Sequence, residues 1–483
     1  MRANELSLTL PPGGRGPLYL QAAQAIQEAI ETGRIRPGMA LPGVRELAER
    51  LGVTVNTVLA ALRELQAQAW VESRERVGFF VADRLPSSRG LPAGRQGEEA
   101  GVGFTMPVHF PPISSMASVG LDLTEGHPDA RLAPAQALGR AYQRALKLKA
   151  PELLGAPDPK GHARLREALS AFLLTQRALR VSADQILVLG SVVLAVNLVA
   201  QAFLGPEGGA VAVESPGNPV LWQALRQSSR AQLHPLPVDA DGARPEALEA
   251  LVQAGTLPVR LAVLTPQCQV PTTVRLGAER RAAILDLARR HRIPILELDA
   301  EYDFLLDQGP TPRPLAVDAP EQVVYVGDLG RMLAPGVRAA YLVAPAPLLP
   351  LLASARRHLD WQGDPLQEWA LSELLLDGEI PRQLLRVRKA AKDRREALED
   401  ALQHAFRGRL ASRAGGTALW LEGVGDLAEP GRFAAWVSAC QSRGLKLRPG
   451  TYYQLGQEPL AATRLGFTAH TPVELQEAVA RMS

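Results

Sequence analysis

The stretch VYVGDLGRMLAPGVR, residues 324–338, decides the fold of the larger part of this chain. It begins with an apolar run typical of a buried strand and continues through a glycine-containing turn to Arg338. Comparable runs precede it, each followed by a segment with helical periodicity: QILVLGS, GAVAVES, VRLAVLTP and IPILELD. Strands that alternate with helices predict parallel strands joined by crossovers, and hence a doubly wound α/β sheet. Ligands of such sheets bind at the carboxyl ends of the strands.

The whole chain has the composition of a globular protein with more than one domain. Its 483 residues are 46% hydrophobic and 21% charged, and two or three domains are expected for that length. We find no run of about 18 or more uncharged apolar residues, and the N-terminal MRANELSLTLPPGG lacks the layout of a signal peptide. Cys268 and Cys440 form neither a disulfide framework nor a metal site by themselves. The composition predicts a soluble cytoplasmic protein without a membrane span or a metal.

Residues 1–83 predict a small α+β unit. PLYLQAAQAIQEAIETGRI has helical spacing and ends near Gly33, a residue suited to a helix C-terminus. RELAERLGVTVNTVLAALRELQAQAW predicts two short helices separated at Gly52, with Thr54 as the cap of the second. WVESRERVGFFVAD then alternates apolar and polar residues, as a two-stranded wing does.

Two further segments follow this unit. Residues 84–118 are rich in Pro, Gly and Ser, and predict a flexible linker. Residues 119–483 carry the alternating strands and helices, with a smaller α/β lobe from about residue 375.

The first segment closely resembles the GntR-type winged helix-turn-helix in PLYLQ, GRIRPGMALPGVRELAERLGVTVNTV and WVESRERVGFFV. The resemblance implies that a recognition helix, starting near Val55, enters the major groove of a double-stranded DNA operator. Arg45 is expected at a phosphate, the residues at the helix start at phosphates or base edges, and Gly78 where the wing approaches DNA. The DNA-binding residues that the resemblance implies are Arg45, Thr54, Asn56, Thr57, Arg74 and Gly78.

Two features of this segment depart from a strong DNA binder. The family usually has an arginine at the position of Val55, and its loss removes about 1–3 kcal/mol if that arginine contacts a base. Residues 1–83 contain nine arginines and nine acidic residues, so modest non-specific affinity is expected. Arg45, Arg74 and Arg76 also suit a solvated surface, and a helix-turn-helix retained only to support a dimer is the alternative.

The large segment resembles fold-type I pyridoxal-phosphate (PLP) enzymes of the aminotransferase class over roughly residues 121–480. The motifs that carry the resemblance are LDLTEGHPDARLAP, PDPKGHARLREALSAFL, LGSVVLAVNL, ESPGNP, LTPQCQVPTTVRL, ELDAEYDF, residues 324–338 and ARLGFTAH. A GntR-type reader, a linker and this fold in one chain resemble the MocR family of bacterial transcriptional regulators. The resemblance implies a head-to-tail homodimer whose large domain senses PLP or an amino compound.

Several residues match the PLP machinery of the aminotransferase class. Asp299 matches the acid at the ring nitrogen and Tyr302 the partner of the ring hydroxyl, although MocR proteins have acids one position to either side. Ser191 and Arg338 match phosphate ligands, and Arg464 matches the arginine that binds the substrate carboxylate. Each has an ordinary alternative: Asp299 capping or pairing inside the fold, Arg338 supporting structure, and Arg464 pairing with a local acid.

Other positions of the cofactor pocket have lost the expected residue. Arg331 replaces the Schiff-base lysine, and a guanidinium remains protonated in proteins and cannot form an aldimine. Asn218 replaces the tyrosine that stacks on the ring. The remaining replacements are Gly330 for serine, Ala156 for tyrosine, Val192 for a polar residue and Thr273 for glycine. The chain has six lysines, none of which follows a strand end near Asp299: Lys147, Lys149, Lys160, Lys389, Lys392 and Lys446.

The sequence therefore predicts a DNA-binding transcriptional regulator, dimeric, whose aminotransferase-like domain has lost covalent PLP chemistry. That domain either senses a small effector or only dimerises; Arg331 is inert or holds an anion. No covalent cofactor is expected, and PLP or a related anionic or amino compound is left as a non-covalent ligand. The main alternative is a PLP-dependent aminotransferase with a vestigial DNA-binding domain. A purely structural or interaction protein is the third.

Overall fold

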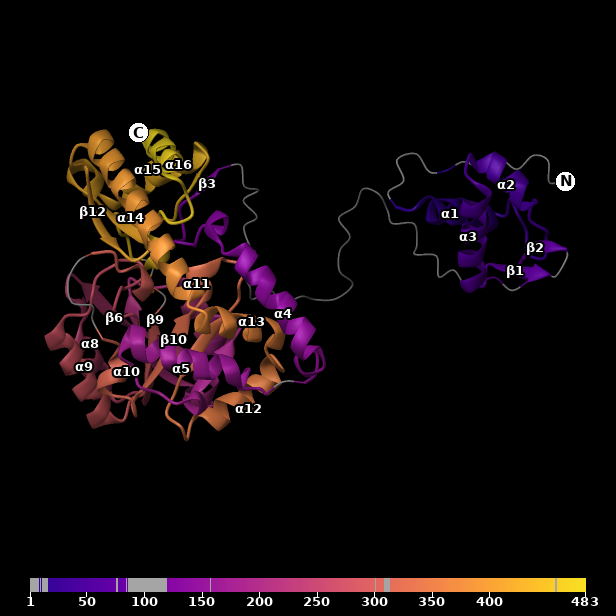
Figure 1. Ribbon diagram of the computed structural model, residues 1–483. Coiled ribbons are helices and arrows are strands. Elements are labelled where there is room, and N and C mark those ends of the chain that lie inside the picture. The colour runs from indigo at the N-terminus through magenta and orange to yellow at the C-terminus, as the bar shows by residue number, and fades with distance from the viewer. Residues whose placement is uncertain are drawn as a thin grey trace. The chain divides into compact units, whose positions relative to one another are not determined.

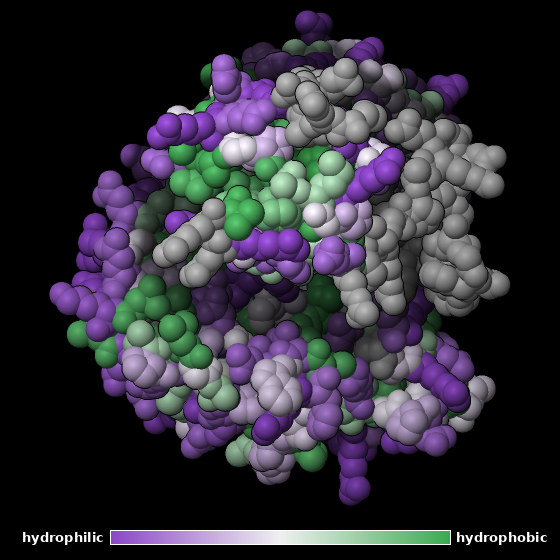
Figure 2. All heavy atoms as spheres, turned by 90° about the vertical axis from the view of Figure 1, so that its right-hand side faces the viewer, coloured by the Kyte–Doolittle hydropathy of each residue, from purple (hydrophilic) through white to green (hydrophobic). Residues whose placement is uncertain are grey.

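The computed structural model divides into two compact units, Met1–Ile113 and Ser114–Ser483 (Figure 1). It describes residues 8, 10 and 16–483, except for 75–76, 84, 86–119, 157, 300, 308–312 and 457. The predicted linker, residues 84–118, lies outside the described residues except for Leu85. No helix in the described part of the chain is long and apolar enough to cross a membrane. On the face drawn in Figure 2, hydrophilic side chains surround small groups of hydrophobic ones.

The N-terminal unit contains three helices followed by a hairpin. Its elements are α1 (Leu18–Glu31), α2 (Val44–Leu51), α3 (Val55–Ala67), β1 (Val71–Arg74) and β2 (Gly78–Val81). Gly52 ends α2 in the left-handed conformation at φ +64°, and the hydroxyl of Thr54 accepts a hydrogen bond from the backbone N–H of Thr57 at 3.2 Å. The hairpin is antiparallel, with Arg74 opposite Gly78. The elements predicted from the sequence are thus present, around a core of their own.

An eight-stranded sheet forms the centre of the second unit. Its strands, in spatial order, are β4 (Ile186–Leu189), β11 (Ala340–Val343), β10 (Val323–Asp328), β9 (Ile295–Asp299), β8 (Val259–Leu264), β5 (Gly209–Ser215), β6 (Ala231–Asp239) and β7 (Gly242–Ala243). The five apolar runs of the sequence all form strands in it. The predicted parallel pairing holds for β10, β9, β8, β5 and β6, whereas β11 is antiparallel to both neighbours and β7 to β6. Only two residues, 240 and 241, join β6 to β7, whereas a parallel crossover needs about a dozen or more.

Helices cover both faces of this sheet, and alternate strand residues supply the two cores. In β10, Val324 and Val326 pack toward the side of α6 and α12, whereas Val323 and Tyr325 pack toward the opposite side. The helices of this part are α4 (Ala135–Leu153), α5 (Ala163–Arg177), α6 (Val192–Leu204), α7 (Pro219–Ser228), α8 (Pro245–Ala254), α9 (Ala278–His291), α10 (Leu315–Asp318), α11 (Gly330–Leu333), α12 (Leu349–Leu359) and α13 (Pro365–Leu376). Short 3-10 turns, η2 (Ala130–Leu132), η3 (Ala183–Gln185) and η4 (Tyr302–Phe304), complete it.

A smaller C-terminal lobe packs against the end of the sheet. Its elements are α14 (Glu379–Phe406), β12 (Leu410–Gly415), β13 (Ala418–Gly423), η5 (Gly425–Ala428), α15 (Pro430–Ser442), β14 (Leu445–Lys446), η6 (Gly450–Tyr453), β15 (Ala462–Gly466) and α16 (Pro472–Met482). The long helix α14 contacts α11 and α13 as well as β12 and α16, so it connects the two parts (Figure 1). The short strand β3 (Leu121–Asp122) pairs with β14, a contribution to the lobe that the sequence did not predict.

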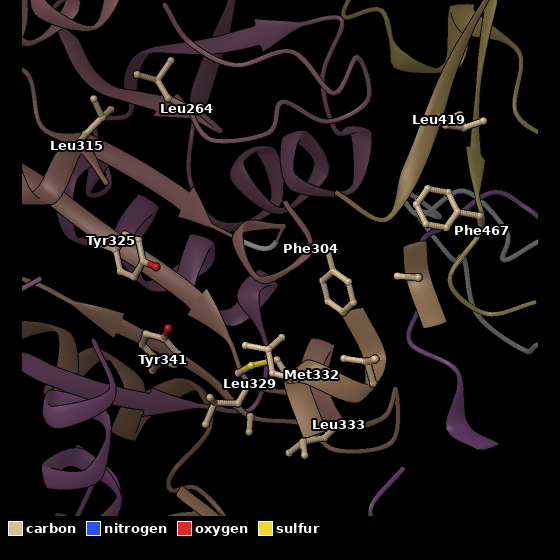
Figure 3. Close-up of a cluster of buried hydrophobic side chains, with 14 of the residues drawn as sticks. Leu264, Phe304, Leu315, Tyr325, Leu329, Met332, Leu333, Tyr341, Leu419 and Phe467 are labelled. Atoms are coloured by element: carbon tan, nitrogen blue, oxygen red, sulfur yellow. The ribbon is translucent and has the colours of Figure 1, made fainter. Parts of the chain in front are cut away.

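One hydrophobic cluster continues from the large sheet into the C-terminal lobe. Figure 3 shows Tyr325 and Tyr341 on adjacent strands, with Met332 and Phe304 between them and Phe467 of the lobe. A core shared in this way fixes the lobe against the carboxyl ends of the strands, where a ligand is expected.

Candidate effector cavity and DNA-reading surface

A cavity of about 520 Å³ lies between the carboxyl ends of the sheet strands and the C-terminal lobe. It brings together five of the seven predicted ligand residues: Ser191, Asn218, Arg331, Arg338 and Arg464. Three carboxylates and a histidine also line it that sequence reasoning missed: Glu125, His127, Glu301 and Asp328. Two other hollows, of about 650 and 620 Å³, lie elsewhere in this unit, and none of the predicted ligand residues lines them. The volume suits a small-molecule ligand.

Arg331 lies on the short helix α11, directly after β10, with its side chain 19% exposed. Its Nη1 donates a hydrogen bond to the carbonyl oxygen of Gly126 at 2.9 Å and lies 3.4 Å from Oε1 of Glu301. Burial disfavours the charge of Arg331, but the nearby carboxylates, Glu301 above all, outweigh burial and hold its pKa above the ordinary value. The residue at the lysine position is therefore a permanently charged member of an ion pair.

The backbone around Arg331 also differs from a serine-lysine site. A Cβ atom on Gly330 would lie 2.3 Å from the carbonyl oxygen of Val337. A serine at residue 330 would therefore require the turn from β10 to β11 to shift.

Glu301 is the cavity carboxylate with the most polar contacts. It is 2% exposed, and its Oε1 lies 3.2 Å from Nη2 of Arg464. Thr417 donates to it twice, from its backbone N–H at 2.8 Å and its hydroxyl at 3.0 Å. Arg464 thus pairs with an acid that is distant in the sequence, and it lies inside β15 of the lobe and not at a strand end of the large sheet. The acids at alternating positions 297, 299 and 301 were the signal available in the sequence.

Asp299 and Tyr302 lie outside the cavity lining. Leu298 lines it instead, because successive residues of a strand face opposite sides of the sheet. Asp299 accepts a hydrogen bond from Nε of Arg177 at 3.1 Å and another from the hydroxyl of Tyr325. Burial raises the pKa of Asp299, and Arg177 offsets part of that rise. Arg177 also stacks on the ring of Tyr302, 3.9 Å from its centroid. Both residues belong to a buried cluster on the other side of the sheet.

The opposite end of the cavity has the features of an anion site. Ser191 caps α6, with its hydroxyl oxygen accepting from the N–H of Leu194 at 3.1 Å. A Cβ atom on Gly190 would lie 3.7 Å from Nη2 of Arg338, so this guanidinium lies close to the start of α6. Arg338 is exposed and makes no ion pair with any described residue. Unpaired N–H groups at a helix start, together with an arginine, favour a phosphate or carboxylate.

The other replaced positions are occupied in ways that do not hold a PLP ring. Asn218 caps α7, accepting from the N–H of Val220 at 3.0 Å. Thr273 has φ +63°, in the region that favours glycine, and its hydroxyl donates to the carbonyl of Arg413. Ala156 is exposed. All six lysines lie in the described part of the chain and none lines the cavity; Lys446, for example, pairs with Asp122 at 3.3 Å.

These residues do not fit a covalently bound PLP. An aldimine requires an amine that can lose its proton, and the basic side chains that line the cavity are three arginines and one histidine. The pyridine nitrogen requires an acid, but Asp299 faces the other side of the sheet. Only the phosphate half of a PLP site has its chemistry present, at Ser191 and Arg338.

The predicted DNA-binding residues of the N-terminal unit lie mainly at its surface. Arg45, on α2, is exposed, as are Thr54 and Asn56 at the start of α3. The hydroxyls of Thr54 and Thr57 lie 2.8 Å apart, so these two side chains also organise the helix start. Val55 is 41% exposed, although it is apolar.

The wing supplies the remaining two positions. Arg74 stacks on Phe80 across the hairpin, 4.3 Å from the ring centroid, which holds its side chain against the wing. Gly78 has φ +124°, and the space where a Cβ atom would project from it is open. Arg76 lies outside the described residues.

Comparison with protein families agrees with this two-part architecture. Residues 18–81 match the gntR family of bacterial regulatory proteins, and residues 119–482 match the aminotransferase class I and II family. The HTH-type transcriptional regulator TauR of Rhodobacter capsulatus is 30% identical over 99% of this chain and 98% of its own length. The pyridoxine biosynthesis transcriptional regulator PdxR of Corynebacterium glutamicum is 26% identical over 99% and 98%. The rhizopine catabolism regulatory protein MocR of Rhizobium meliloti, whose role is given as probable, is 26% identical over 79% and 76%.

Solved structures share the fold of the large unit. The α-aminoadipate aminotransferase LysN of Thermus thermophilus, crystallised with N-(5'-phosphopyridoxyl)-L-leucine, superposes with a TM-score of 0.67 at 23% identity, over 75% of this chain and 91% of that one. An archaeal alanine:glyoxylate aminotransferase gives a TM-score of 0.68 at 24% identity, over 75% and 89%. The aminotransferase fold is thereby established for this unit.

Proposed function

The chain belongs to the MocR-type transcriptional regulators, in which a GntR DNA-binding domain is fused to an aminotransferase class I and II domain, and from that premise we propose that its large domain is a non-covalent sensor of a phosphate-bearing ligand. As a regulator of this type it binds DNA through the N-terminal unit. The aminotransferase fold is one that associates with PLP in general.

The observation that carries the proposal is the ion pair between Arg331 and Glu301. It occupies the position from which a lysine would react, and no lysine lines the cavity. A charged guanidinium cannot be the nucleophile of a Schiff base, so the proposed sensor has no covalent step.

The anion end of the cavity supports a phosphate as the recognised group. Arg338 has no ion pair with a described residue, and it lies beside the start of α6, a helix of 13 residues. A phosphate there would accept hydrogen bonds from the fork of Arg338, the hydroxyl of Ser191 and the first N–H groups of α6. Asn218 adds an amide at the cavity wall. We further propose that the chain acts as a homodimer, head-to-tail as the family resemblance implies, on a two-part operator.

The proposed function is tested with full-length protein and pyridoxine 5'-phosphate, which has the phosphate and ring of PLP but no aldehyde. Isothermal titration is expected to detect binding to the wild type, and Arg338→Ala is expected to weaken it about tenfold or more, the loss of a charge-assisted hydrogen bond pair. Arg290→Ala, which removes an exposed arginine paired with Asp286 on α9, is the matched control and is expected to bind as the wild type does.

The regulatory part is tested by measuring affinity for DNA from the region upstream of the chain's own gene, with and without the same compound. A change in affinity or footprint on adding pyridoxine 5'-phosphate supports a sensor. Absence of binding by the wild type, or equal binding by the Arg338 variant, would contradict the proposed ligand class.

A further inference from the structure

We propose that Glu301 is a built-in carboxylate that occupies Arg331 and Arg464, and thereby restricts the cavity to ligands with an anionic group at the Arg338 end and no carboxylate at the Arg464 end. The inference rests on the proposed function, because it specifies which phosphate-bearing ligands the same cavity accepts. It predicts that α-amino acids and dicarboxylates are excluded from this site.

The contacts of Glu301 leave little of its carboxylate for anything else. Oε1 lies 3.4 Å from Nη1 of Arg331 and 3.2 Å from Nη2 of Arg464, and it also accepts from the hydroxyl of Thr417. Oε2 accepts from the backbone N–H of Thr417 at 2.8 Å. One internal carboxylate therefore meets both arginines, as a ligand carboxylate would.

The neighbouring backbone leaves room for this arrangement. Gly416 has φ +57°, and a Cβ atom on it would lie 2.4 Å from Oε2 of Glu301. The turn between β12 and β13 is thus shaped around the carboxylate. Because Glu301 follows β9 whereas Thr417 and Arg464 belong to the C-terminal lobe, the carboxylate also ties the lobe to the sheet.

Arg464 depends on Glu301 for its charge balance. The side chain of Arg464 is 2% exposed, and its Nε and Nη1 are buried without a hydrogen-bond partner in the described part of the chain. Its Nη2 meets only Glu301 and the hydroxyl of Thr417 among the described residues. Without the carboxylate, Arg464 would be an uncompensated buried cation, and such a cation favours the entry of an anion.

With Glu301 present, a second carboxylate at this end meets unfavourable charges. Glu125 and Asp328 line the same part of the wall as Arg331, and both contribute negative charge near it. Glu301 shares its charge between two arginines, and with Glu125 and Asp328 nearby this end of the cavity has no excess positive charge for a ligand carboxylate. At the other end Arg338 keeps its charge available, since no described residue pairs with it. The two ends of the cavity therefore differ in the charge they accept.

The test measures binding of succinate to full-length protein by isothermal titration. The wild type is expected to show no saturable binding, and Glu301→Gln is expected to bind at least about tenfold more tightly, because two arginines become available. The double variant Glu301→Gln/Arg464→Gln is expected to lose the gain. The matched control is Glu477→Gln, which breaks a Glu–Arg pair on the exposed face of α16 and is expected to behave as the wild type does.

Thermal unfolding gives a second readout that a merely structural role of Glu301 would not produce. Succinate is expected to raise the melting temperature of Glu301→Gln and to leave that of the wild type unchanged. Should Glu301→Gln yield no folded chain, Glu301→Asp withdraws the carboxylate by one methylene and is expected to show a smaller gain of the same kind.

Succinate binding to the wild type with similar affinity, or no gain in any folded Glu301 variant, would overturn the inference. Failure of the proposed function is a separate result, since it is measured with pyridoxine 5'-phosphate on the wild type and Arg338→Ala. If Glu301→Gln binds succinate but the wild type does not bind pyridoxine 5'-phosphate, the proposed role of Glu301 stands and the proposal of a phosphate-bearing ligand is rejected.

Discussion

Arg331 and Glu301 form an ion pair at the wall of the cavity. A guanidinium at the lysine position brings a fixed positive charge into a site that is largely buried, and Glu301 lies within ion-pair distance of it. Arg464 shares the same carboxylate. An arginine at residue 331 was evident from the sequence, whereas its contact with Glu301 was not, because that contact joins α11 to the segment after β9 and depends on the fold.

Arg331→Lys tests whether the lysine alone is missing. The variant is expected to form a covalent adduct with PLP that borohydride traps, since it supplies an amine that can lose a proton. It is expected to show no transamination, because Asp299 pairs with Arg177 on the other side of the sheet and Asn218 offers no ring to stack. The adduct is measured by intact mass and the activity by transfer of an amino group to 2-oxoglutarate. Measurable transamination would mean that the remaining pocket is still competent.

Val55→Arg tests the DNA-reading surface. Val55 is exposed at the start of α3, so an arginine there is expected to reach DNA and strengthen operator binding by about 1–3 kcal/mol, with a steeper salt dependence. Fluorescence anisotropy over a range of salt concentrations measures both effects. Leu351→Arg adds the same charge at an exposed leucine of α12 in the large unit and serves as the control. Equal strengthening by both variants would point to non-specific attraction and against α3 as the reading helix.

At the scale of elements, periodicity predicted which segments form strands but not how all of them pair. Four of the five apolar runs form strands that are buried on both faces, and the fifth, β8, is buried from Leu261 onward. β6 has a weaker signal than these runs, because it mixes polar residues such as Gln232 and His234 into its apolar positions. Strand alternation also explains why Asp299 matched a motif but does not line the cavity. A shift of one residue along a strand moves the side chain to the other face of the sheet.

The end of β5 carries a pH dependence that follows from burial. Burial raises the pKa of Glu214 from its ordinary 4.5 to about 7, although Thr265 after β8 donates to it. Between these two values the folded chain holds a proton that the unfolded chain releases. Stability from Glu214 is therefore complete below pH 4.5 and is lost as the pH rises through 7.

Glu214→Gln is expected to remove the pH-dependent part of the stability that Glu214 contributes. From about pH 5 to about pH 8 the wild type is expected to lose up to about 3 kcal/mol more than the variant. Urea unfolding followed by tryptophan fluorescence at the two pH values measures the difference. Burial also raises the pKa values of Glu297 and Glu368 to about 7. Both residues are present in the wild type and in the variant, so their contributions cancel in the difference between the two proteins. Parallel pH profiles for the two proteins would contradict the assignment.

At the scale of the whole molecule, the order of motifs was sufficient to predict a DNA reader followed by an aminotransferase fold. Each unit has its own hydrophobic core, so the fold of one does not depend on contacts with the other. The same resemblance predicted seven ligand residues, of which the cavity contains five. What the motifs did not contain are the contacts made between distant segments, such as β3 with β14 and Glu301 with Thr417.

The most direct test of a sensor without covalent chemistry is the absorbance spectrum of purified full-length protein with and without PLP, followed by borohydride reduction and intact mass. We expect no visible band from a protein-bound Schiff base and no reduced adduct at any of the six lysines, even where pyridoxine 5'-phosphate binds. A stoichiometric adduct of reduced PLP mass, mapped to one lysine, would contradict it and would identify the residue that replaces the amine lost at Arg331.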